Sequence, residues 1–194
     1  YIDKNGKVVI EPQYDYAVAF SEGLAMIEKD GKCGYIDKTG KVVIEPQFDD
    51  ADYFSEGLAM VGKKGKWDYI DKSGKVVIEP QFDDAYPFNE GFGRVEKDGK
   101  WGFIDKIGKV VIELQFDEVS DFIEGFVHVK KDGKWGFIDK SGKVVIEPQF
   151  DEVSDFVEGF AKVEKDGKGG YIDRNGKVVI EPPIRPTSLR HWPK

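Results

Sequence analysis

Apolar and polar residues alternate along the chain in short runs that are typical of β-strands. Residues 126–130 place two valines on one face of an extended chain, and the Asp132-Gly133 pair that follows suits a tight type I′ hairpin turn. Residues 135–139 form a second alternating run, and residues 144–146 are apolar throughout. We therefore predict three short strands joined by tight turns.

The third of these runs, Val-Val-Ile, is apolar on both faces and is predicted to be the most buried strand. Pro148 has no N–H to give to a ladder, so it is expected to end this strand. The segment 149–159 then links one unit to the next. It offers Phe150 and Phe156 as apolar anchors and Glu158-Gly159 as a turn.

The pattern recurs every 34 residues, and a glycine closes the hairpin before each all-apolar run, where a left-handed backbone is expected. These glycines are Gly6, Gly40, Gly74, Gly108, Gly142 and Gly176. The full repeats are 1–34, 35–68, 69–102, 103–136 and 137–170, followed by a partial repeat 171–182 and a non-repeat tail 183–194. Residues 1–182 are therefore predicted to form one β-repeat array.

A period of 34 residues is shared with the helical tetratricopeptide repeat, but no stretch has the 3.6-residue apolar period of a helix. No unit can bury its apolar strands alone, so neighbouring units are expected to stack. We predict an all-β fold of tandem three-stranded β-meanders in an open, twisted array. The alternative is a closed, β-propeller-like toroid, whose blades usually have four strands and more than about 40 residues.

Charge and composition narrow the classes of function. The formal net charge is −8, which argues against a basic footprint for nucleic acid or anionic membrane. No apolar run approaches the length of a membrane span. The single cysteine, Cys33, excludes an intramolecular disulfide but leaves the compartment open. Because Tyr1 falls within a motif and is not Met, we expect a fragment or processed form.

Catalytic and cofactor motifs are absent from the sequence, so we predict a non-enzymatic protein without a cofactor. Nucleophilic triads and zinc sites are poorly supplied by one cysteine and two histidines, His128 and His191. An aspartate recurs at the hairpin, as in Asp139, and a glutamate in the connector, as in Glu158. Such rows could bind calcium, but hydrogen bonds from turn N–H groups explain the aspartates better, and calcium is not expected.

One position changes freely from repeat to repeat between constant β-branched neighbours. We call it the variable row: Met26, Met60, Arg94, His128 and Lys162. It is predicted to face solvent and to be the candidate recognition row for a partner. The tryptophans at another position, Trp67, Trp101 and Trp135, are predicted to pack between units, with a glycan-binding aromatic strip as the alternative.

The run Lys-Trp-Gly-Phe-Ile-Asp, followed by Gly-Lys-Val-Val-Ile-Glu-Pro and Phe-Asp, resembles the WG-repeat family, also called KWG repeats. The resemblance covers residues 1 to about 182. The Trp-Gly pair is intact at 101–102 and 135–136, and it is replaced by Cys33-Gly34, Trp67-Asp68 and Gly169-Gly170; Leu114 replaces the proline of one unit. The resemblance implies tandem β-repeats, mostly in bacterial proteins, and brings no catalytic residues.

These features favour a non-enzymatic scaffold that mediates protein–protein interaction. A structural or spacer segment of a surface or adhesive protein is the first alternative, and a glycan-binding module is the second. The partner is expected to be another protein, with no nucleic acid and no membrane span. Localisation is left open between the cytoplasm and export from a bacterium. Trp192, in the tail, is a candidate to cover an exposed end of the array.

Overall fold

The computed structural model describes residues 1–180 and divides the chain into two compact units, Tyr1–Asp121 and Phe122–Lys194. All regular elements among the described residues are β-strands, which confirms the predicted all-β class. No described segment forms a helix with the length and apolar character needed to cross a membrane. The non-repeat tail and the expectation for Trp192 lie outside the described residues.

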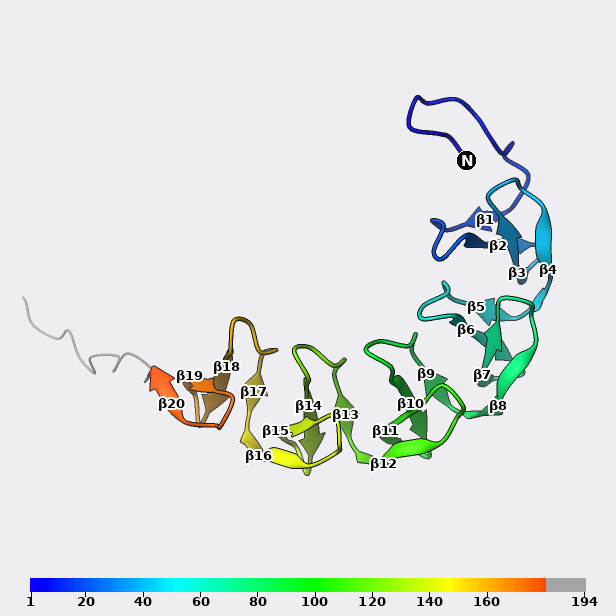
Figure 1. Ribbon diagram of the computed structural model, residues 1–194. Coiled ribbons are helices and arrows are strands. Elements are labelled where there is room, and N and C mark those ends of the chain that lie inside the picture. Colours follow the sequence, from blue (N-terminus) through cyan, green and yellow to red (C-terminus); the bar gives the residue numbers. More distant parts are fainter. Residues whose placement is uncertain (181–194) are drawn as a thin grey trace, which may run out of the picture. The chain divides into compact units, whose positions relative to one another are not determined.

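Antiparallel four-stranded sheets repeat along the chain, and neighbours in sequence are neighbours in each sheet (Figure 1). The first sheet contains β1 (Tyr16–Ala17), β2 (Leu24–Lys29), β3 (Lys32–Asp37) and β4 (Val42–Phe48). The second contains β5 (Asp50–Ala51), β6 (Leu58–Lys63), β7 (Lys66–Asp71) and β8 (Val76–Phe82). The third contains β9 (Asp84–Ala85), β10 (Gly93–Lys97), β11 (Lys100–Ile104) and β12 (Val110–Phe116), and β13 (Glu118–Val119) ends the strands of the first unit.

The second unit repeats the arrangement. The fourth sheet of the chain contains β14 (Phe126–Lys131), β15 (Lys134–Asp139) and β16 (Val144–Phe150). Its last sheet contains β17 (Glu152–Val153), β18 (Phe160–Lys165), β19 (Lys168–Asp173) and β20 (Val178–Ile180). The prediction of three strands per repeat was therefore wrong. The missed strand is only two residues long and lies in the segment predicted as a connector; β17 is an example.

The Val-Val-Ile run is also placed differently from the prediction. It begins the outer strand of each sheet, so only its isoleucine is well covered: Ile146 is 5% exposed, whereas Val144 is 41% exposed. The strand does not end at Pro148 but continues to Phe150, which pairs with Trp135. A register shift between Trp135 and Phe137 forms a bulge in which the proline is tolerated. The β11–β12 pair has the same shift with Leu114 in place of the proline, so the bulge does not depend on the missing N–H.

The predicted turns are confirmed. Asp132 and Gly133 have φ values of 51° and 77°, which is the pair of left-handed positions that a type I′ turn requires. Gly142 has φ of 80° and donates its N–H to the carbonyl of Asp139 at 2.9 Å. Glu158-Gly159 forms a further two-residue turn, because Val157 and Phe160 exchange backbone hydrogen bonds.

Consecutive sheets within a unit bury apolar faces against each other. In the first unit, one face of the first sheet meets the opposite face of the second. The shared core contains Leu24, Met26, Cys33, Tyr35, Ile44, Phe48, Ala51, Phe54, Ala59, Val61 and Ile70. The second and third sheets repeat this contact, and so do the last two sheets of the second unit. Each inner strand therefore contributes to two cores, one on either side of its sheet.

Hydroxyl groups join the sheets of the first unit across these cores. The Tyr35 hydroxyl donates to the carbonyl of Asp52 at 2.7 Å, and the Tyr69 hydroxyl donates to the carbonyl of Tyr86 at 2.8 Å. The matching residue that joins the last two sheets, Phe137, is equally buried but has no hydroxyl. That join consequently relies on apolar packing where the earlier ones add a directed hydrogen bond.

The Trp-Gly pair has a steric cause. Gly136 lies opposite the bulge of β16, and a Cβ atom added there would approach the Ile146 carbonyl oxygen to 2.5 Å and the Pro148 nitrogen to 2.6 Å. Real Cβ atoms do not come this close to backbone atoms, so only glycine fits without a shift of the outer strand. The glycine and the proline-containing bulge are thus two parts of one packing arrangement.

Candidate functional site

The aspartates of the hairpin row act in turns. Oδ1 of Asp139 accepts hydrogen bonds from the backbone N–H groups of Ser141 at 2.8 Å and Lys143 at 3.1 Å. The Ser141 hydroxyl donates to the same carboxylate and lowers the pKa of Asp139. Equivalent turn bonds are made by Asp3, Asp37, Asp71, Asp105 and Asp173. The turn explanation of these residues is therefore confirmed.

The glutamates of the connector row tie three repeats together. Oε2 of Glu22 accepts a hydrogen bond from the N–H of Gly57 at 3.0 Å and lies 3.0 Å from Nζ of Lys72. The lysine also donates to the Glu22 carbonyl at 3.0 Å. These contacts, led by the lysine hydrogen bond, lower the pKa of Glu22. Glu56 repeats the same pattern one repeat later.

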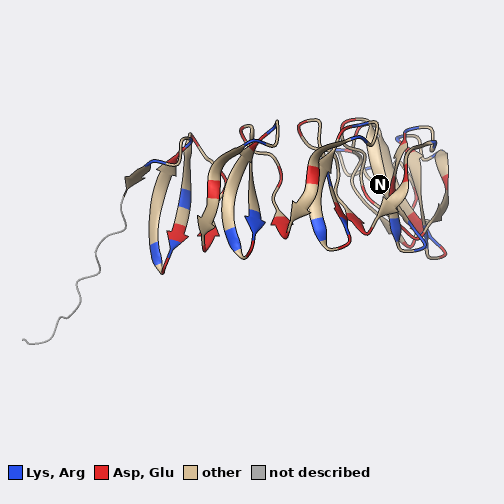
Figure 2. Cartoon of the chain, turned by 90° about the horizontal axis from the view of Figure 1, so that it is seen from below, with Lys and Arg blue, Asp and Glu red and all other residues tan. Residues whose placement is uncertain are grey.

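A further set of ion pairs links the lysine of each hairpin turn to the aspartate that follows the outer strand. Nζ of Lys100 lies 2.6 Å from Oδ1 of Asp117, and Lys134 makes the equivalent contact with Asp151. Figure 2 shows basic and acidic segments side by side at the same ends of the strands in both units. These lysines and aspartates are therefore paired between neighbouring strands.

Asp68 stands where four other repeats have glycine. It is 3% exposed, and its Oδ1 has no hydrogen-bond partner. Burial raises the pKa of Asp68 to about 6. The described residues hold no cluster of three or more side chains suited to a metal ion, at Asp68 or elsewhere. The sequence showed this departure from Trp-Gly, and the structure shows that it is a buried carboxyl group with one oxygen lacking a hydrogen bond.

The variable row does not form one exposed line, so the prediction that it faces solvent was wrong. Met26 and Met60 are each 7% exposed and belong to the cores between the first three sheets. Only Lys162 is fully at the surface. The error has a physical cause. Within a unit, this face of a sheet is covered by the sheet that follows it, so the residue in the row must fit the neighbouring sheet.

Arg94 shows how the row adapts within the first unit. Its guanidinium lies 3.6 Å from the ring centroid of Tyr86 and 5.6 Å from that of Trp101. One nitrogen donates to the Val119 carbonyl at 3.1 Å and lies 3.6 Å from Oδ1 of Asp121. The guanidinium is thereby held between aromatic rings and the next repeat.

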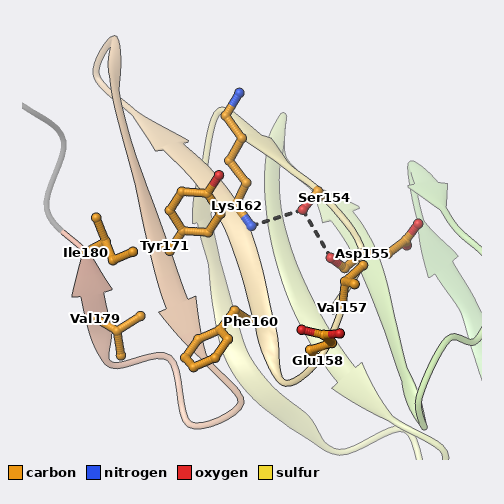
Figure 3. A pocket seen from close by; sticks show the side chains of 9 residues that line it. All are labelled: Ser154, Asp155, Val157, Glu158, Phe160, Lys162, Tyr171, Val179 and Ile180. Atoms are coloured by element: carbon orange, nitrogen blue, oxygen red, sulfur yellow. Dashed lines mark hydrogen bonds between the residues drawn. The ribbon is translucent and has the colours of Figure 1, made fainter.

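His128 plays the matching part in the second unit. Its Nδ1 lies 3.3 Å from Oδ1 of Asp155, and its ring packs edge-on against Trp135 at 5.0 Å. Lys162, the next member of the row, lies on the last sheet (Figure 3). Its backbone N–H donates to the Ser154 hydroxyl at 3.0 Å.

The tryptophans are half-buried. Trp67 and Trp135 pack against the cores that join their sheets to the next ones, which agrees with the predicted packing between repeats. Trp101 lies 5.7 Å from the ring of Tyr86 and shares that contact with Arg94. Cys33 occupies the same slot in the first sheet and is buried.

The last described sheet leaves one face uncovered by residues 1–180. We call it the end face: Phe160, Lys162, Tyr171, Val179 and Ile180. Phe160, Tyr171 and Ile180 are 48%, 43% and 57% exposed. In the preceding sheet, the counterparts of Tyr171 and Ile180 are Phe137 and Ile146, which are 1% and 5% exposed, and Phe126, the counterpart of Phe160, is partly buried. The side chains border a hollow of about 640 Å³ (Figure 3).

Sequence reasoning did not single out the end face. Its residues repeat those of the buried faces, so their types alone predict burial. The available signal was positional: the pattern that supplies the covering sheet breaks off after Pro182. Only the stacking order, which the structure provides, tells which face of the last sheet is left open.

Comparison with solved structures supports the fold. The chain is similar to a structure described as the crystal structure of the eukaryotic initiation factor, with 13% identity, a TM-score of 0.53, and coverage of 87% of this chain and 55% of that one. It is also similar to Hsv2p of Kluyveromyces lactis, with 12% identity, a TM-score of 0.50, and coverage of 85% and 63%. These neighbours are propeller-like proteins, and the chain spans about three fifths of the length of the first solved structures that it matches.

No curated protein matches the chain. The family described as "WG containing repeat" matches it six times in tandem, at residues 1–33, 34–67, 69–101, 101–135, 135–168 and 170–182. These matches run in tandem from residue 1 to residue 182. The chain therefore belongs to the WG-repeat family, as the motif resemblance predicted.

Proposed function

We propose that this chain is a non-enzymatic repeat scaffold that binds another protein through the end face. The supporting observation is the exposure of Phe160, Tyr171 and Ile180, whose counterparts in the preceding sheet lie beneath another sheet. An aromatic and aliphatic surface with one central cation, Lys162, has the composition of an interface core more than that of an ordinary exposed face.

The size of the hollow agrees with this role. A hollow of about 640 Å³ lined by nine residues can receive several side chains of a partner. Its polar groups do not converge as a catalytic site requires: Asp155 lies against His128, and Glu158 lies in a two-residue turn. This surface therefore offers shape and apolar contact to a partner, rather than a set of catalytic groups.

The experiment is a comparative pull-down from the organism that encodes the chain. We expect the double variant Phe160→Ser, Ile180→Ser to lose the proteins that the unchanged chain retains. Both side chains are exposed, so the variant should keep its melting temperature. The matched control is Val43→Ser, Val77→Ser, which removes two valines of 40% and 37% exposure from outer strands elsewhere.

Retention of the same proteins by the end-face variant would contradict the proposal. Loss from both variants would also contradict it, because binding would then follow general surface hydrophobicity. The earlier candidate, the variable row, is tested beside them with Arg94→Ser, His128→Ser and Lys162→Ser. Because Arg94 and His128 are largely covered, only the Lys162 change is expected to act on binding directly.

A structural spacer is the second candidate function. The observation that favours it is the glutamate row, in which Glu22 contacts both Gly57 of the next repeat and Lys72 of the one after. Such contacts stiffen a run of repeats without creating a recognition surface. A chain that retains no protein in the pull-down, with or without the end-face changes, would support the spacer role.

The open array belongs to the same proposal. A closed ring is the alternative, because four-stranded antiparallel sheets are also the blades of propellers. A small-angle scattering profile distinguishes an elongated particle from a compact disc of the same mass. A maximum dimension that matches a disc would contradict the open array.

A further inference from the structure

The variable row follows a pairing rule that the inner sheets reveal. Where the row holds a basic side chain, the next repeat places a carboxylate against it: Arg94 lies 3.6 Å from Asp121, and His128 lies 3.3 Å from Asp155. Asp121 and Asp155 are themselves 34 residues apart, so they occupy one position of the repeat. The row and its facing position therefore match one another in charge.

The first two sheets obey the rule in its apolar form. Their row residues are Met26 and Met60, and the positions that match Asp121 hold Tyr53 and Pro87. Neither is acidic. A buried methionine needs no counter-charge, and an unpaired carboxylate beside it would be costly to cover. Each sheet thus carries on one face a side chain suited to the sheet that follows it.

Lys162 is the next cation of the row, and it lies on the end face. It stands between Phe160 and Tyr171, just as His128 stands between Phe126 and Phe137 on the preceding sheet. Within residues 1–180, no carboxylate forms an ion pair with Lys162. The matching carboxylate would belong to whatever covers this face.

The sequence beyond Ile180 does not supply such a residue in the repeat pattern. It contains one acidic residue, Glu181, against Arg185, Arg190 and Lys194. A covering segment with this balance would bring further positive charge toward Lys162. Charge complementarity therefore favours an occupant other than residues 181–194.

We propose that the end face receives a β-sheet of the same repeat class that carries a carboxylate opposite Lys162. The established contact between the last two sheets defines the rest of its surface. There the covering sheet supplies Phe156, Ala161, Val163 and Ile172 against Phe137 and Ile146. The partner is thus a WG-type sheet with an aromatic, small and β-branched face and one acidic residue at the position of Asp155. This inference rests on the proposed function, because it names the partner of the same face.

The experiment adds such a sheet to the chain. Residues 181–194 are replaced by a second copy of residues 147–180, so that the added Asp155 comes opposite Lys162. We expect amide hydrogen exchange in β18 and β19 to slow at least tenfold relative to the unextended chain. Changing the added Asp155→Lys should remove most of this protection, and combining that change with Lys162→Glu should restore it.

Four results would overturn the inference. Protection that is absent although the added copy is itself protected would show that the face does not accept a sheet. Protection that ignores both charge changes would show that no carboxylate is required. Faster exchange in β18 after deletion of 181–194 alone would assign the face to the chain's own tail, and a sedimenting dimer that Phe160→Ser dissociates would assign it to a second copy.

If the added copy does not fold, a second measurement on the unextended chain still tests the pairing of the variable row with its carboxylates. In the unextended chain, Asp155→Lys should accelerate exchange in β18, and His128→Asp together with it should return the rate to within about threefold of the original. Independent, additive effects of the two changes would overturn the pairing rule itself. None of these results depends on the pull-down, so failure of the pairing rule and failure of the binding role are told apart.

Discussion

The carboxylate of Glu56 lies 3.2 Å from Nζ of Lys106, fifty residues further along the chain. The contact joins a connector turn to a hairpin two repeats away and lies at the surface. We expect Lys106→Met to lower the free energy of unfolding by less than about 1 kcal/mol at low salt, because exposed ion pairs contribute little. The effect should vanish near about 1 M salt, where such pairs are screened.

Denaturant unfolding at two salt concentrations measures this difference. Lys109→Met serves as the control, since it removes a lysine from the same hairpin whose side chain forms no ion pair in the described part of the chain. A loss that persists at high salt would contradict the electrostatic explanation and point to packing of the lysine stem.

Asp68 should be a site where a substitution stabilises the protein. Asp68→Gly removes a buried, unsatisfied carboxyl group and restores the residue that fits against the bulged outer strand. The pKa of Asp68 is raised from 3.8 to about 6, so the folded state favours the protonated form. At pH 7 the gain should be about 1 to 3 kcal/mol, at about 1.4 kcal/mol per pKa unit.

The gain depends on pH with a defined sign. Between about pH 4 and pH 6 the folded protein binds this proton more tightly than the unfolded chain, so the original protein gains stability as the pH falls. The advantage of Asp68→Gly should therefore shrink across this window. A difference that stays constant from pH 7 to pH 4 would refute the titration of Asp68. The reverse change, Gly102→Asp, should destabilise the third sheet.

Arg94 should be replaceable by methionine but not by serine. Methionine fills this position in the first two sheets, and Arg94→Met would also remove a buried guanidinium nitrogen that has no partner. We expect Arg94→Met to cost less than about 1 kcal/mol, and Arg94→Ser to cost about 2 kcal/mol because it leaves a gap beside Tyr86. Equal costs in chemical denaturation would contradict the packing role.

Trp101→Ala should lower the free energy of unfolding by about 2 to 3 kcal/mol. This value lies at or below the usual cost of truncating a buried tryptophan, because the ring of Trp101 is only partly covered by Tyr86 and Arg94. Trp101→Phe is the matched variant and should recover about half of the loss. A cost under about 1 kcal/mol would mark the tryptophans as surface residues and favour the glycan-binding alternative.

Calcium should leave the melting temperature unchanged. The carboxylates of the hairpin row already accept two backbone hydrogen bonds each, as Asp105 does from Ile107 and Lys109. Recruiting them to a cation would break the turns that they hold. A thermal scan with and without millimolar calcium checks this, and a clear rise in the melting temperature would contradict the turn explanation.

The turns and the period could be predicted from sequence because they depend on local backbone chemistry. Asp132-Gly133 and Gly142 require left-handed backbone, and the aspartate before each turn bonds within a few residues. The two-residue strand Glu152–Val153 could not be predicted in the same way. It is too short and too polar to show a period, and it is defined only by its pairing with the next strand.

Burial was predicted less well, because it depends on contacts between sheets. Val144 is as apolar as a core residue but lies on an outer strand, while Met60 lies in a freely changing position but is covered by the next sheet. A sequence read one repeat at a time contains no information on what lies above a sheet. The candidate site could not be predicted for the same reason. The end face has the residue types of a core and differs from one only because no described sheet covers it.

The hydroxyls of Tyr35 and Tyr69, and their replacement by Phe137 in the second unit, imply a direction for the loss of structure. Each contact between sheets of the first unit contains a tyrosine hydrogen bond, whereas the last two sheets are joined by apolar packing and by ion pairs such as that of Lys134 with Asp151. Under denaturant or a steady pull, the last two sheets should separate before those of the first unit. The surface proposed to meet a partner then lies on the sheet that is lost first, so an occupant there would protect the second unit against unfolding.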